Sequence, residues 1–255
     1  MRGYALSFVI FVVVTIASTF GLRLLEEVYG LAGEAFQLHQ LGPLIGAIAA
    51  ALLVSASSMP NGPSPVARKQ WIAHTILGVA AALVFALIVW AGLTLFGVPG
   101  VDLSRTGAGT VIVALLGGLA GAVVQEIGWR GYLQPLLESR MPRIGAAVIV
   151  GMLWSLWHVS ALTDLLTGLL LFATYVPLGI LLGHLGNGAA WQRVATTALV
   201  HWLLTLPVMF MAGIGGVQVQ IAVAIAAVVV TAVFMAMFVV ATKRRTARAA
   251  EISTS

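Results

Sequence analysis

Long apolar runs recur from one end of this chain to the other, and they leave it little choice of fold. A helix needs about 20 apolar residues to cross a hydrocarbon core of about 30 Å, and runs of this length follow one another with short interruptions. In lipid every backbone polar group must be satisfied within the chain, which favours helices. We therefore expect an all-α membrane bundle, formed as a single domain by residues 1–255, with the lipid bilayer as its main partner.

The apolar runs predict about eight transmembrane helices. Their expected ranges are 4–22, 38–57, 71–97, 110–136, 144–161, 164–185, 191–212 and 216–242. Turn residues such as Gly186-Asn187-Gly188 separate them. The first run is longer than the roughly 7 to 15 residues of a signal-peptide core, so we interpret it as a retained helix, with cleavage near Ala17 and Ser18 as the alternative.

The few charges in the sequence predict an orientation. Only 8% of the residues are charged, whereas soluble domains carry roughly a quarter. With eight spans, one side holds only Arg23 and Arg105. The other side holds Arg2, Arg68, Lys69, Arg130, Arg140, Arg143, Arg193 and the tail cluster Lys243, Arg244, Arg245 and Arg248. This asymmetry predicts a multi-pass protein of the cell membrane with both termini in the cytoplasm. The basic tail is typical of an anchor beside anionic lipid, not of a nucleic-acid surface.

Three of the expected helices carry ionisable side chains, which cost roughly 2.5 to 3.5 kcal/mol each in lipid. The polar stripes are Glu126, Arg130 and Gln134 on the fourth helix, Ser155 and His158 on the fifth, and Thr197, His201 and Thr205 on the seventh. Any one stripe could be a self-neutralising pair or a satisfied histidine. Three stripes facing one another predict a hydrated pocket for transport or catalysis. We interpret His39, His74 and His184, near helix ends, as structural.

Three short motifs carry a family resemblance. Residues 125–133 read QEIGWRGYL, residues 153–158 read LWSLWH, and residues 198–201 read ALVH. In this order and spacing they resemble the CPBP intramembrane protease family, which includes the type II CAAX prenyl endopeptidases and Abi-like bacterial proteins linked to bacteriocin immunity. The resemblance covers about residues 110–212.

The resemblance implies a peptidase that cleaves membrane peptides or proteins. The second glutamate of the family's first motif corresponds to Glu126, its arginine to Arg130, the aromatic and histidine of the second motif to Trp154 and His158, and the last histidine to His201. The family is often described as a metalloprotease. On that description Glu126, His158 and His201 are the ligands expected for a divalent metal such as zinc.

Two positions depart from the family pattern. Gln125 stands where a first glutamate is expected, and Thr205 stands where Asn or Asp is expected. A carboxylate can accept a proton from water whereas an amide cannot, and general-base catalysis is worth a factor of about 10² to 10⁴. Glu126 can replace the missing base only in a different geometry, since neighbouring helical residues point about 100° apart.

The leading interpretation is a peptidase in which Gln125 and Glu126 hold a water or metal. His158 and His201 would be ligands or oxyanion stabilisers, and Arg130 would be an electrostatic clamp. This requires the fourth helix to continue to about Leu137, so that Glu126 lies deep enough to meet His158. A catalytically impaired scaffold or immunity-type protein is the second interpretation. A transporter or proton relay is the third, because buried Glu and His also serve there.

Overall fold

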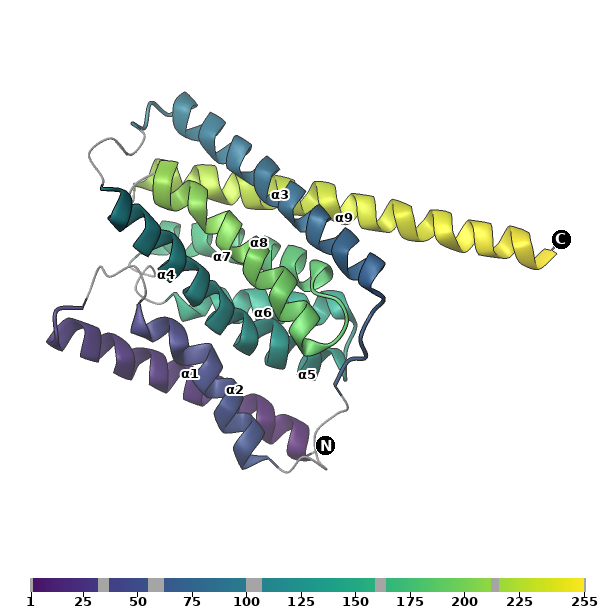
Figure 1. Cartoon of the computed structure of the whole chain (residues 1–255), viewed down its shortest axis with the longest axis horizontal. Coiled ribbons are helices and arrows are strands. Elements are labelled where there is room, and N and C mark those ends of the chain that lie inside the picture. The colour runs from purple at the N-terminus through teal and green to yellow at the C-terminus, as the bar shows by residue number, and fades with distance from the viewer. Residues whose placement is uncertain are drawn as a thin grey trace.

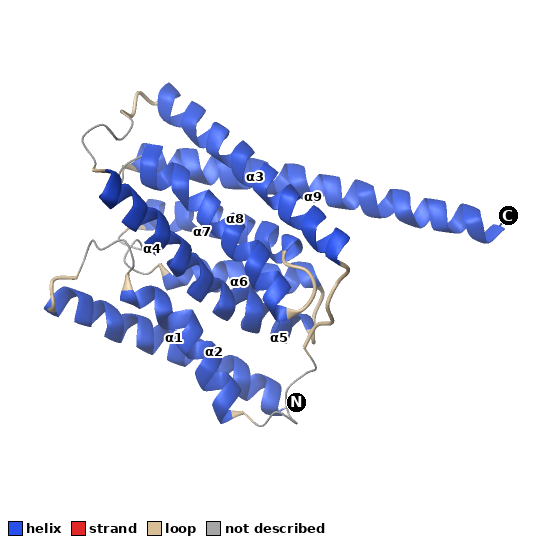
Figure 2. Ribbon diagram, viewed as in Figure 1, coloured by secondary structure: helices blue, strands red, loops and turns tan. Residues whose placement is uncertain are grey.

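The chain folds into a bundle of helices packed side by side, with one helix that extends far beyond the rest (Figure 1). The structure is a computed structural model and describes residues 2–31, 37–54, 62–99, 107–158, 164–211 and 216–254. In chain order the helices are α1 (Arg2–Val28), η1 (Leu38–Leu41), α2 (Gly42–Leu53), α3 (Arg68–Leu95), α4 (Ala108–Glu126), η4 (Ile127–Leu133), α5 (Gln134–Glu138), α6 (Arg143–Trp157), α7 (Leu165–Leu185), α8 (Ala190–Met211) and α9 (Val217–Thr254). The described residues contain no strand (Figure 2).

The predicted all-α, multi-pass membrane bundle is confirmed. Six helical stretches are long and apolar enough to cross a membrane, and two shorter apolar stretches, Leu38–Leu53 and Arg143–Trp157, complete the eight predicted segments. The shorter helix α6 has 15 residues, which at 1.5 Å per residue is about 22 Å and less than the thickness of the core. Helix α6 is therefore shorter than a full membrane span.

Several helix ends differ from the sequence-based expectation. Helix α1 continues to Val28, and α9 continues to Thr254. The expected helix 144–161 ends at Trp157, because His158 has φ −80° and ψ 44° and so leaves the helical conformation. The last residues expected in that helix, 159–161, and Arg105, which the sequence predicts to be external, lie outside the described residues.

Glycines let neighbouring helices approach closely in the bundle. A Cβ on Gly179 of α7 would lie 2.6 Å from the Cα of Gly151 on α6, and a Cβ on Gly46 of α2 would lie 2.8 Å from the carbonyl oxygen of Phe11 on α1. Small residues at helix interfaces are the usual means of packing in lipid. The buried apolar side chains of the resulting core include Phe85, Val89, Trp154, Leu181, Leu182 and Val200. Helices α4, η4, α6 and α8 hold the candidate site in this core.

Candidate functional site

A π-helical turn begins immediately after the site glutamate. Glu126 is the last residue of α4, and the next seven residues form η4 before α5 resumes the α-helix. The helix does continue past Leu137, as the site required, but its expected uniform α geometry is wrong. A Cβ on Gly128 would lie 2.4 Å from the Pro43 oxygen, and a Cβ on Gly131 2.9 Å from Val194 Cγ2. The two glycines thus let the widened turn fit between α2 and α8. Such π turns are frequent at functional sites.

Glu126 joins two helices through a single oxygen. Its side chain is fully buried. Oε1 accepts a hydrogen bond from Arg130 Nη1 at 2.7 Å and lies 2.9 Å from His201 Nδ1. Since an ionised carboxylate only accepts, Nδ1 of His201 carries the shared proton. The fourth and seventh expected helices therefore meet at Glu126 and His201, as their polar stripes predicted.

Helix α6 joins this cluster through a tryptophan. The Arg130 Cζ atom lies 4.6 Å from the centroid of the Trp154 ring, within the range of a cation–π contact. The same indole meets the His201 ring edge-on, with ring centroids 4.9 Å apart. Trp154 thus fixes both the cation and the imidazole that bond Glu126.

His158 also packs near that indole. Its Nδ1 is 2.8 Å from the Trp154 carbonyl oxygen, and its ring stacks on Tyr175 at 4.1 Å. The centroids of His158 and Trp154 are 6.2 Å apart, so Trp154 has both histidines as neighbours. The stacking partner Tyr175, on α7, was not predicted, because no polar periodicity marks it in the sequence.

Four buried polar atoms of the cluster have no hydrogen-bond partner among the described residues. They are Glu126 Oε2, Arg130 Nε, Arg130 Nη2 and Trp154 Nε1. A buried polar group without a partner costs about 1 to 3 kcal/mol. Such groups in a folded protein call for an explanation, such as an ordered water or a catalytic role. These atoms are the ones whose hydrogen-bonding capacity the described residues leave unused.

The two departures from the family pattern lie beside the cluster without bonding to it. Gln125 is buried, and its side chain makes no hydrogen bond with the described residues. It shares a helix face with Gly121, which lies against Gln40 of η1. Thr205 donates to the Trp202 carbonyl oxygen at 2.7 Å. Its hydroxyl is thus used within its own helix.

The other residues of the predicted stripes bond elsewhere. Ser155 donates to the Gly151 oxygen, Thr197 donates to the Arg193 oxygen, and Gln134 donates to the Gly183 oxygen. Gln134 also bonds Glu138 Oε1, so it belongs to a second polar group further along the same helical stretch and makes no bond to Glu126. The three histidines interpreted as structural do have structural partners: His39 pairs with Glu26, His74 with Asn187, and His184 with the Ile180 carbonyl oxygen.

The expected metal ligands are not arranged around a common point. In the described part of the chain, no three His, Asp or Glu side chains are grouped so that they could hold an ion. The Nδ1 of His201 is turned to Glu126, and the Nδ1 of His158 is turned to the Trp154 carbonyl oxygen. Glu126, His158 and His201 do not fit a metal in this geometry. The divalent ion stays a prediction, and the chemistry below makes no use of it.

Comparison with known proteins places this cluster in a recognised sequence segment. Residues 107–207 match the family model described as type II CAAX prenyl endopeptidase Rce1-like. This segment is thus similar to the Rce1-like family. It contains Glu126, Arg130, His158 and His201, so the resemblance inferred from the three motifs is confirmed. A family of this kind supports a CAAX-type intramembrane protease function in general terms.

Curated relatives share the Rce1-like segment at low identity. Lysostaphin resistance protein A of Staphylococcus aureus strain MRSA252 is 24% identical over 210 residues, which are 82% of this chain and 50% of that protein. The protein of the same name from strain Newman is 23% identical over 210 residues, with the same coverage of both chains. The chain therefore spans about half the length of the curated relatives it matches.

Proposed function

We propose that the chain is an intramembrane endopeptidase that hydrolyses peptide bonds of membrane-associated proteins or peptides. One observation carries the proposal: buried Glu126 is held at Oε1 by Arg130 and His201, while Oε2 has no partner among the described residues. A carboxylate fixed on one side and free on the other can accept a proton from an attacking water. Arg130 supports this role, since its positive charge favours the ionised form of the carboxylate.

The remaining roles follow from which atoms are free. Glu126 Oε2 takes the proton as the water attacks the peptide carbonyl, and returns it to the leaving amine. Arg130 Nε and Nη2 are donors without a partner in the described part of the chain, and they stabilise the negative charge that develops on the carbonyl oxygen. His158 bonds the Trp154 carbonyl oxygen through Nδ1, so Nε2 of the neutral ring is an acceptor. His158 therefore orients the water and does not donate to the oxyanion.

The test compares cleavage of a membrane-peptide library by purified wild type, Glu126→Gln and His201→Gln. We expect turnover by wild type and a fall of about 10² to 10⁴ in Glu126→Gln, the usual worth of a general base. The matched control is Glu27→Gln, the same change in the exposed Arg23–Glu27 pair, which should cleave like wild type. Assays with added metal and with chelator test the divalent ion. Full turnover by Glu126→Gln would refute the proposal.

A second candidate function is a membrane protein that confers resistance without cleaving peptides. Two observations favour it: Gln125 replaces a carboxylate of the family pattern, and the relatives are named for lysostaphin resistance. The test is expression of wild type and Glu126→Gln in a lysostaphin-sensitive host. Equal protection by both, with no cleavage in the library, would favour this function. Loss of protection in Glu126→Gln would tie protection to the peptidase site.

We also propose that the protein lies in the cell membrane with both termini in the cytoplasm. The basic residues at the ends and in the alternate connections support this orientation. A reporter enzyme fused after residue 255 should give a cytoplasmic signal. An external signal would contradict the orientation.

A further inference from the structure

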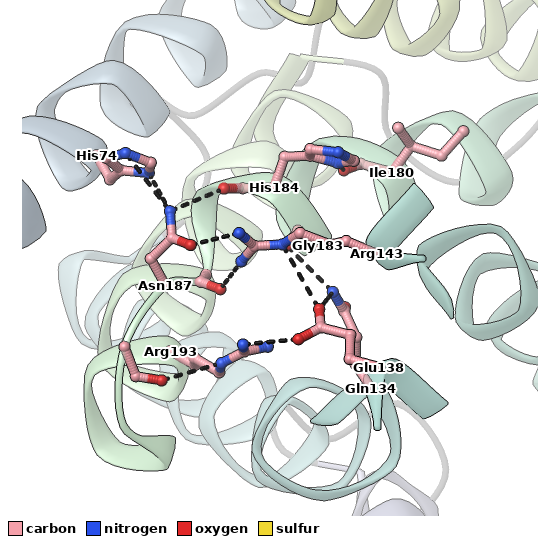
Figure 3. Close-up of polar contacts among 11 residues, drawn as sticks. His74, Gln134, Glu138, Arg143, Ile180, Gly183, His184, Asn187 and Arg193 are labelled. Carbon is pink, nitrogen blue, oxygen red and sulfur yellow. Dashed lines mark hydrogen bonds and ion pairs between the residues drawn. The ribbon is translucent and has the colours of Figure 1, made fainter. Parts of the chain in front are cut away.

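A second buried polar network lies where α5 and α7 end and α6 and α8 begin (Figure 3). Glu138 is at its centre. Oε2 of Glu138 bonds Arg193 Nη2 at 2.7 Å, and Oε1 accepts from Gln134 Nε2 at 2.8 Å. Arg143 Nε is 3.5 Å from the same Oε1. Both oxygens of this carboxylate therefore have partners.

The two arginines of the network also fix the backbone around them. Arg143 donates to the carbonyl oxygens of Gly183 and Gly186 at the end of α7, and to Asn187. Arg193 donates from Nε to the Gly188 oxygen at 3.0 Å. Cations are favourable beside the free carbonyls at a helix C-terminus. Helices α5, α6, α7 and α8 are thereby tied together at one end of the bundle.

The network and the candidate site lie on the same two structural elements. Glu126 and Glu138 belong to the continuous helical stretch α4–η4–α5, and their partners His201 and Arg193 both belong to α8. The carboxylates are 12 residues apart on one element and their partners 8 residues apart on the other. Two bonds at different heights fix both the rotation and the vertical register of one helix against another.

The π turn is what lets both carboxylates face α8. Each residue of an α-helix turns by about 100°, so residues 12 positions apart would point about 120° away from each other. A π turn holds one residue more than an α turn, so it lowers the angle between the two residues by about 100°. Glu126 and Glu138 thus lie on nearly one face because η4 lies between them.

We propose that Glu138 and Arg193 are a positioning pair: they fix the rotation and register of α8 against α4–η4–α5 and so hold His201 on Glu126. The catalytic consequence rests on the proposed peptidase function, whereas the placement of α8 does not. Arg193 is buried and Glu138 is partly buried, with side-chain exposures of 7% and 17%, so solvent screens the pair less than it screens a surface ion pair. Neither residue touches the reacting groups. Both act through the helices that carry them.

The placement is tested by a distance measured between two spin labels. The natural sequence contains no cysteine, so Leu116→Cys on α4 and Ala195→Cys on α8, both exposed, can be labelled without a background signal. Glu138→Gln should shift or broaden the distance distribution in lipid nanodiscs, because a slip of one residue moves α8 by about 1.5 Å. Glu138→Asp, which keeps the charge, should stay close to the wild-type distribution. Glu27→Gln is the matched control for loss of a carboxylate.

The second test of the positioning pair is a measurement of turnover. A misplacement of about 1 Å can lower kcat by about 10², so Glu138→Gln should lower kcat with little change in KM, and Glu138→Asp should restore most of it. A wild-type distance in Glu138→Gln would overturn the positioning of α8. A shifted distance with unchanged kcat would overturn its catalytic consequence. If wild type has no turnover, the peptidase proposal fails and the distance alone decides. If Glu138→Gln does not fold, the distance and kcat are measured in Arg193→Lys instead, and the same outcomes apply.

Discussion

Glu126 and Glu138 are two carboxylates on one helical stretch, each bonded to a residue of α8, yet they are satisfied to different degrees. Glu138 uses both oxygens, and Arg143 beside it uses three nitrogens. In the Glu126 cluster, Oε2 of Glu126 and both Nε and Nη2 of Arg130 have no partner among the described residues. Few buried polar groups in proteins stay unpaired.

The difference indicates what each network is for. In the Glu138 network, Gln134 Oε1 and Arg193 Nη1 lack a partner among the described residues, but both carboxylate oxygens and three Arg143 nitrogens have one. This more nearly satisfied network suits a structural role, since it adds stability and fixes geometry. A network that keeps buried acceptors and donors free pays for it in folding free energy, and such local inconsistencies are typical of functional sites. The same residue types thus serve packing at one end of the stretch and, as we propose, chemistry at the other.

The largest expected effect comes from completing the carboxylate pair of the site. Gln125→Glu supplies a second base of nearly the same size, and we expect turnover to rise by up to the 10² to 10⁴ typical of a general base. The measurement is kcat on the same peptide library. Gln218→Glu, the same change at an exposed position of α9, should leave kcat unchanged. Unchanged or lower turnover in Gln125→Glu would show that the site does not lack a base.

The second largest effect is a loss of folding stability when the cation beside Glu126 is removed. Arg130→Met leaves the fully buried Glu126 without its cation, and breaking a buried pair in this way costs about 3 to 5 kcal/mol. Denaturant unfolding in detergent should show this loss. Glu126→Gln combined with Arg130→Met should recover part of it, because neither charge is then left buried alone. A double variant less stable than Arg130→Met would contradict this account.

The smallest of the three effects is expected in the network around Glu138 and Arg143. Arg143→Met removes donors to the end of α7, and hydrogen bonds from charged groups are worth about 1.5 to 3 kcal/mol each. Arg143 is 30% exposed, so water replaces part of what is lost and the total should stay below the cost of Arg130→Met. The same unfolding assay compares the two variants. A greater loss in Arg143→Met would reverse the comparison.

The sequence predicted the elements of the fold and part of the site. Eight apolar segments, the pairing of Glu126 with Arg130, and the meeting of Glu126 with His201 follow from run length and from the cost of polar groups in lipid. The π turn does not follow, because the expected 3.6-residue period assumes uniform α geometry. The partner of Gln134 does not follow either, since it bonds the Gly183 oxygen on a helix that is distant in the sequence.

Two further features depend on contacts between distant parts of the chain. The end of α6 at Trp157 lies inside a motif that reads as continuous helix, so the break at His158 is set by packing on Tyr175 and by the bond to the Trp154 oxygen. The pairing of Glu138 with Arg193 joins residues 55 positions apart. No signal in the sequence indicates this pair. From the sequence, Arg193 is interpreted only as one of the charges that set the orientation in the membrane, and Glu138 is assigned no role.

The length of α9 has a consequence for anything attached to it. The helix has 38 residues, about 57 Å at 1.5 Å per residue, and its apolar span Val217–Ala241 accounts for 25 of them, about 37 Å. The remaining helix projects roughly 20 Å past the apolar span, away from the other helices (Figure 1). A fluorescent protein or affinity handle fused beyond α9 would stand clear of a detergent belt on a stiff stalk.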